Sequence, residues 1–61
     1  MPYINVKVVG PLSREQKEEI AAKFTQTLED VANKPKDHTY VVFDEIDRQN
    51  WAVGDRLLDE R

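Results

Sequence analysis

The chain has 61 residues with no cysteine and one histidine, and nine Lys and Arg against twelve Asp and Glu give a net charge of −3. This composition excludes a disulfide framework and a zinc site of Cys and His ligands, and it lacks the basic excess that nucleic-acid binding requires. The length predicts one domain, residues 1–61. Its core is too small to stabilise a monomer well, so assembly into oligomers is expected.

The N-terminal residues predict a β-strand from Tyr3 to Val9. Ile4, Val6 and Val8 alternate with polar or aromatic neighbours, and β-branched residues dominate the apolar side. This alternation is typical neither of a signal peptide nor of a membrane span, because both need a continuous apolar run. We therefore expect a soluble, cytoplasmic protein with no membrane partner.

An amphipathic helix is predicted next. Ser13 followed three residues later by Gln16 fits a capping box, so the helix should begin at Arg14, and Asn33 with Pro35 should end it. Apolar residues recur at helical spacing within an arc of about 120°. The members of this arc are Ile20, Ala21, Phe24, Leu28, Val31 and Ala32.

Residues 39–46 are β-branched and aromatic before they turn acidic, which predicts a second strand. The order β, α, β favours an α+β fold in which the two strands are parallel and the crossover is right-handed. One face of this sheet and both of its edges would stay open, so neighbouring subunits should complete it. Residues 51–54 form a short apolar piece that we expect to pack on a neighbour, and residues 55–61 should form a helical turn or fray.

Pro2 is the first candidate for chemistry. It can be a simple strand-edge proline, or, if Met1 is removed, a free secondary amine held by an ordered strand and able to act as a general base. A base near neutral pH needs a lowered pKa, which an apolar wall or nearby cations can provide. Trp51 could form such a wall, and the cationic candidates are Lys7, Arg14 and Arg48.

The other polar candidates have simpler interpretations. Trp51 could equally anchor a subunit interface. Asp44 and Glu45 are successive strand residues that point to opposite faces, so they cannot act as a carboxylate pair, and at least one should lie at a solvated strand end. Ser13 is a helix cap rather than a nucleophile, and His38 should be exposed rather than catalytic.

Four segments together resemble the 4-oxalocrotonate tautomerase family of the tautomerase superfamily. They are MPYINVK, SREQKEEI, VVFDEID and NWAVGD, in this order along the whole chain. The resemblance implies that Met1 is removed and that Pro2 is the general base in enol-to-keto isomerisation of 2-hydroxydienoates and related 2-oxo acids. It also implies a homo-oligomer, commonly a hexamer built from dimers, and chemistry without cofactor or metal.

The chain departs from this family at the substrate-binding positions. Two family arginines that hold carboxylate and polarise the 2-oxo group align with Leu12 and Tyr40, and the aromatic pocket residue aligns with Trp51. We therefore expect weak binding of the family's dicarboxylate substrate, with Tyr40 able to donate a hydrogen bond to a developing enolate. Two alternatives stay open: hydratase or dehalogenase chemistry within the superfamily, and a non-catalytic oligomeric binding module.

Overall fold

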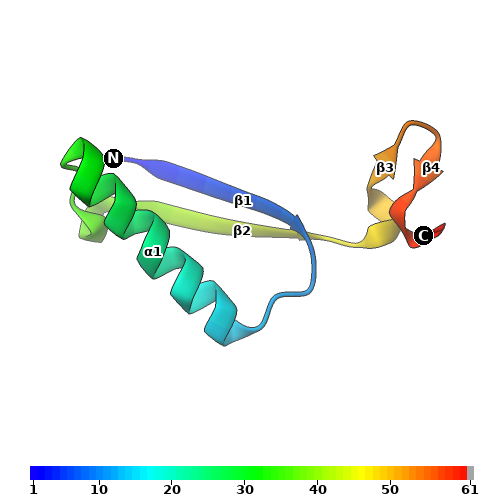
Figure 1. The fold of residues 1–61 in the computed structure, drawn as a ribbon, viewed down its shortest axis with the longest axis horizontal. Helices are drawn as coiled ribbons and strands as arrows, with labels where there is room; N and C mark the ends of the chain where they lie inside the picture. Colours follow the sequence, from blue (N-terminus) through cyan, green and yellow to red (C-terminus); the bar gives the residue numbers. More distant parts are fainter. Residues whose placement is uncertain (61) are drawn as a thin grey trace.

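The computed structural model describes residues 1–60, which form a β-α-β unit followed by a small hairpin (Figure 1). The unit consists of strand β1 (Tyr3–Val9), helix α1 (Arg14–Ala32) and strand β2 (Tyr40–Ile46). Strands β3 (Ala52–Val53) and β4 (Arg56–Leu57) form the hairpin. Three short 3₁₀ turns lie between or after these elements: η1 (Lys36–His38), η2 (Arg48–Asn50) and η3 (Leu58–Glu60).

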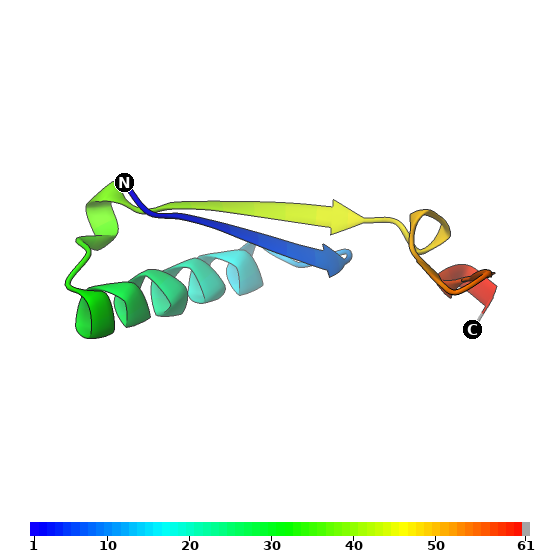
Figure 2. The same cartoon turned by 90° about the horizontal axis from the view of Figure 1, so that it is seen from above.

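β1 and β2 are parallel, as the length of the intervening helix predicted. Their register pairs Tyr3 with Tyr40 at one end and Val9 with Ile46 at the other. The second strand begins one residue later than the sequence suggested, within the usual uncertainty of strand ends. α1 covers one face of this two-stranded sheet and leaves the other face open (Figure 2).

Both ends of α1 confirm the predicted caps. The Ser13 hydroxyl accepts a hydrogen bond from the Gln16 amide at 3.1 Å, and the Gln16 side chain accepts one from the Ser13 amide at 2.9 Å. At the other end Asn33 adopts a left-handed conformation with φ of 57°, and its amide donates to the Glu29 carbonyl. These contacts satisfy backbone groups that a helix end leaves without intrahelical partners.

The C-terminal hairpin differs from the prediction for the tail. β3 and β4 pair antiparallel, and Gly54 between them has a φ of 64°, a conformation that glycine adopts without steric cost. The hairpin lies beyond the end of β2, away from the β-α-β unit (Figure 1). The predicted helical turn is restricted to η3, and residue 61 lies outside the described residues.

The described residues contain no fully buried apolar side chain. Among residues 1–60, Thr25 on α1 is the one buried residue, 8% exposed, and its hydroxyl donates to the Ala21 carbonyl. Part of the predicted apolar arc of α1 stays in solvent, since Phe24 is 44% and Val31 is 82% exposed. The molecule measures 15 Å along its shortest axis, which leaves room for only one helix against one sheet.

Within residues 1–60, α1 is the only long helix, and it is too polar to cross a lipid bilayer.

Candidate active site

Pro2 lies at the open end of the sheet, directly before β1. Its carbonyl accepts a hydrogen bond from the Tyr40 amide at 2.9 Å, so the residue is tied to the first residue of β2. Beside it, Met1, Asp37, His38 and Tyr40 line a shallow hollow of about 260 Å³. His38 is exposed, as the sequence predicted, but its place in this hollow was not foreseen. Pro2 itself is half-buried.

Leu12 lies at the opposite end of the sheet, in the loop of residues 10–13 that joins β1 to α1. Its amide donates a hydrogen bond of 2.7 Å to the Glu45 carboxylate, and the Gly10 amide donates to the Ile46 carbonyl at 3.2 Å. The loop is therefore fixed to the C-terminal end of β2. Because the Leu12 amide already has a partner, it is not available to donate a hydrogen bond to a ligand.

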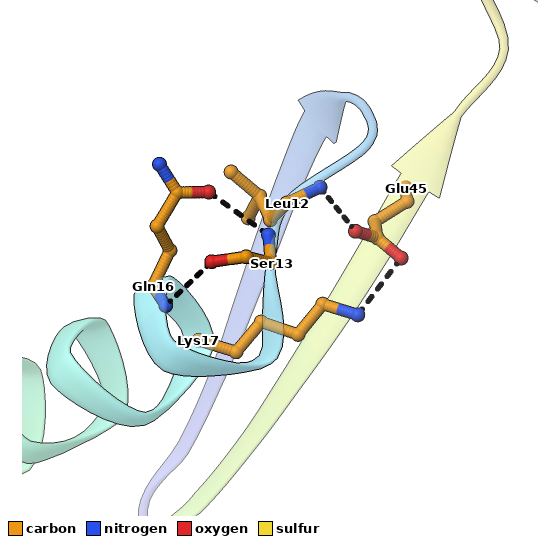
Figure 3. Close-up of polar contacts among 5 residues, drawn as sticks. All are labelled: Leu12, Ser13, Gln16, Lys17 and Glu45. Carbon is orange, nitrogen blue, oxygen red and sulfur yellow. Dashed lines mark hydrogen bonds and ion pairs between the residues drawn. The ribbon is translucent and has the colours of Figure 1, made fainter.

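Glu45 connects three elements at this end of the molecule (Figure 3). One carboxylate oxygen accepts from Leu12 and the other accepts from the Lys17 ammonium group at 3.0 Å. The Leu12 amide first, and Lys17 second, hold the pKa of Glu45 below its ordinary value. The sequence did not indicate this role, although the strand alternation puts Glu45 on the same face as Val41 and Phe43, where a carboxylate needs partners.

Trp51 follows η2, beyond the end of β2. Its carbonyl accepts a hydrogen bond from the Leu58 amide at 2.9 Å, and its own amide donates to the Arg48 carbonyl at 3.4 Å. The residue is half-buried within one chain. These contacts hold the Trp51 backbone to η2 and η3 rather than to the sheet of β1 and β2.

The structure thus brings together only some of the predicted site residues. Pro2 and Tyr40 are neighbours where β1 and β2 begin, whereas Leu12 and Trp51 come after the ends of these strands. Six strand steps between the two ends correspond to about 20 Å. A small ligand cannot bridge this distance, so one chain by itself does not assemble all four residues into one pocket.

The three cationic candidates all have partners in the chain. Lys7 pairs with Asp44 at 2.9 Å on the open face of the sheet, and the hydrogen bond that Lys7 donates to the Asp44 carboxylate raises the pKa of Lys7. Arg14 pairs at 3.2 Å with a glutamate one helical turn later. Arg48 donates a hydrogen bond of 3.0 Å to the Leu58 carbonyl. Lys7 and Arg48 are thus committed to contacts away from Pro2.

Among residues 1–60, no three His, Cys, Asp or Glu side chains gather closely enough to hold a metal ion.

Comparisons with known proteins agree with this architecture. The family model described as tautomerase enzyme matches residues 2–61. A probable tautomerase of Dickeya dadantii is 34% identical over 62 aligned positions that cover 100% of this chain and 92% of the relative. DmpI from Helicobacter pylori, 28% identical, superposes with a TM-score of 0.88 over 98% of this chain and 100% of its own.

A 4-oxalocrotonate tautomerase from Chloroflexus aurantiacus shares the fold, with 22% identity and a TM-score of 0.87 over 98% of this chain and 97% of its own. A single β-α-β unit with an open sheet is the fold of this class of small tautomerase-like proteins. The chain belongs to the tautomerase family, whose members are isomerases.

Proposed function

We propose that the chain, after removal of Met1, is a cofactor-independent tautomerase that interconverts the enol and keto forms of a small 2-oxo acid. The Pro2 nitrogen accepts the proton of the enol hydroxyl, the electron pair shifts to form the carbonyl, and the proton returns to carbon. No atom is gained or lost, so the step needs no oxidant, reductant or co-substrate.

The hydrogen bond between the Pro2 carbonyl and the Tyr40 amide is the observation that carries this proposal. It holds the Pro2 carbonyl at the start of an ordered strand, which supports a fixed position for the attached ring, and a fixed position is what a general base requires. While Met1 is attached, the Pro2 nitrogen is a tertiary amide without a basic electron pair. Removal of Met1, which lines the adjacent hollow, would both create the amine and open space beside it.

Lowering the pKa of this amine requires a contribution from outside the single chain. The hollow next to Pro2 is lined by Asp37 and His38 but by no Lys or Arg, and a carboxylate favours the protonated amine. Burial beneath a neighbouring subunit would have the opposite effect, because desolvation disfavours the charged form. The proposed function therefore depends on assembly.

A pocket shared between subunits also explains the distribution of the site residues. We propose a homo-oligomer, of hexameric size, in which the Pro2 and Tyr40 end of one chain meets the Leu12 and Trp51 ends of its neighbours. The separation of these ends within one chain and the absence of buried apolar side chains in residues 1–60 support this arrangement. The related Chloroflexus aurantiacus enzyme is a heterohexamer.

The substrate should carry only one carboxylate. Leu12 offers an apolar side chain and no free amide, and Tyr40 offers a neutral hydroxyl as a donor to the developing enolate oxygen. Neither residue can form the paired contacts by which arginine binds a carboxylate. A dicarboxylate would therefore leave one charged group without a partner, at a cost of about 2 kcal/mol or more.

The test is the decay of ultraviolet absorbance of a simple enol acid such as phenylenolpyruvate. We expect Pro2→Ala to lower the rate about 100-fold or more, the usual contribution of a general base. Pro35→Ala removes a proline outside the proposed site and should match wild type. Intact mass must show that Met1 is absent from the active preparation. Equal rates for wild type and Pro2→Ala would favour the non-catalytic binding module.

A further inference from the structure

We infer that Glu45 is a positioning residue of the proposed active site, whose carboxylate holds the loop of residues 10–13 so that Leu12 presents its side chain to the substrate. The inference rests on the proposed function, in which Leu12 forms one wall of a pocket shared between subunits. Glu45 itself touches no reacting atom, and it acts through the backbone of Leu12.

The two carboxylate oxygens of Glu45 have different hydrogen-bond partners. One accepts the Leu12 amide at 2.7 Å and the other accepts Lys17 of α1 at 3.0 Å, so the carboxylate joins β2, the loop and the helix (Figure 3). Hydrogen bonds to a charged acceptor are short and about twice as strong as neutral ones. Figure 3 shows the Leu12 side chain pointing away from Glu45, as it must if that side chain is to meet another molecule.

The loop of residues 10–13 packs closely against the Glu45 side chain. A Cβ atom added at Gly10 would lie 3.1 Å from the Glu45 Cβ, tighter than most real contacts, so the loop passes directly over the Glu45 stem. The side chain is 31% exposed and continues the helix-facing row of Val41 and Phe43. An apolar residue would satisfy packing at such a place, whereas a carboxylate there loses solvation unless it is hydrogen-bonded. The hydrogen bond to the Leu12 amide explains why a carboxylate stands at position 45.

Three variants test the hydrogen bond between the Leu12 amide and Glu45. Glu45→Met keeps the length of the side chain and removes the acceptor, Glu45→Gln keeps an oxygen for the Leu12 amide, and Glu19→Ala is the control. Glu19 also pairs with a lysine, at 2.7 Å, but both residues of that pair belong to α1. Each protein is prepared at full length without Met1, and sedimentation compares its assembly with wild type.

Two measurements are made on each variant. Hydrogen exchange of the Leu12 amide, measured by NMR, should be about tenfold faster in Glu45→Met, because a hydrogen bond to a charged acceptor is lost. In the phenylenolpyruvate assay Glu45→Met should raise KM about tenfold with little change in kcat. Glu45→Gln should recover most of both effects, and Glu19→Ala should show neither.

The outcomes separate this inference from the proposed function. An active wild type together with unchanged Leu12 exchange or unchanged KM in Glu45→Met overturns the role of Glu45 alone. Loss of assembly in Glu45→Met also overturns it, because the role would then lie in folding. Equal turnover by wild type and Pro2→Ala refutes the proposed function and the positioning role with it.

Discussion

Replacement of Val31 by lysine tests whether the subunit functions alone or in an assembly. Val31 lies near the end of α1, belongs to the predicted apolar arc and is 82% exposed in the single chain. If a neighbouring subunit covers this arc, Val31 becomes buried. If the chain is monomeric, the side chain stays in solvent and its replacement is harmless.

The two cases predict effects of opposite sign. Full burial of a valine contributes about 1.5–3 kcal/mol, so covering the exposed 82% would contribute roughly 1.2–2.5 kcal/mol per subunit. In an isolated subunit, lysine has a higher helix propensity than valine. It would also place a cation in a last helical turn that has none, which the helix dipole favours. Val31→Lys should therefore preserve or improve folding of the subunit while it weakens association.

Sedimentation velocity at several protein concentrations measures this effect. The loss of contact energy corresponds to association that is weaker by roughly 7- to 70-fold at each affected contact. Ala22→Lys is the matched control, because Ala22 is exposed and lies nine residues away, about 180° around the helix. Sedimentation of Val31→Lys identical to wild type at every concentration would refute burial of the arc. A wild-type monomer at micromolar concentration would refute the assembly itself.

Three further predictions concern the loop, the cap and the site. Tyr40→Phe should lower enol turnover about tenfold or more if its hydroxyl stabilises the enolate, and an unchanged kcat/KM would remove that role. Ser13→Ala should reduce the free energy of unfolding by about 1 kcal/mol through loss of the bond to Gln16, while Ser13→Asp should restore it; equal chemical-denaturation midpoints for wild type and Ser13→Ala would contradict this. The Leu12 amide and Lys17 lower the pKa of folded Glu45. Its contribution to stability is therefore present above the ordinary carboxyl pKa and lost as the pH falls through the lowered value. Acid titration followed by circular dichroism should show the stability gap between wild type and Glu45→Gln closing at low pH, and a constant gap would argue against the contact.

Local chemistry explains why most of the fold was predictable. Ser13 and Gln16 can cap a helix through contacts only three residues apart, and Asn33 ends the same helix by its own conformational preference. The alternation of β1 likewise depends on neighbouring residues in the chain. Each of these features is decided within a few residues, so the bounds of β1 and α1 agree with the prediction.

The features that were not predicted from the sequence have a common physical origin. The hairpin of β3 and β4 has strands of two residues each, too short to produce a periodic pattern, although Gly54 marks its turn. The contact of Glu45 with Leu12 joins residues 33 positions apart, and only the β-α-β crossover brings them together. The alternation of β2 indicated the face of the sheet on which Glu45 lies. It did not indicate that the Leu12 amide would donate a hydrogen bond to the Glu45 carboxylate there.

By itself, the sequence determined the order of β1, α1 and β2 and the ends of the helix, because these follow from short-range preferences, and it supplied the candidate residues for chemistry. Only the tertiary structure decided which of those residues lie together. The parallel pairing of β1 with β2 puts Pro2 beside Tyr40 and sends Leu12 to the far end of the sheet. That distance is a property of the strands' length and direction, and it is the reason why the proposed pocket would require more than one chain.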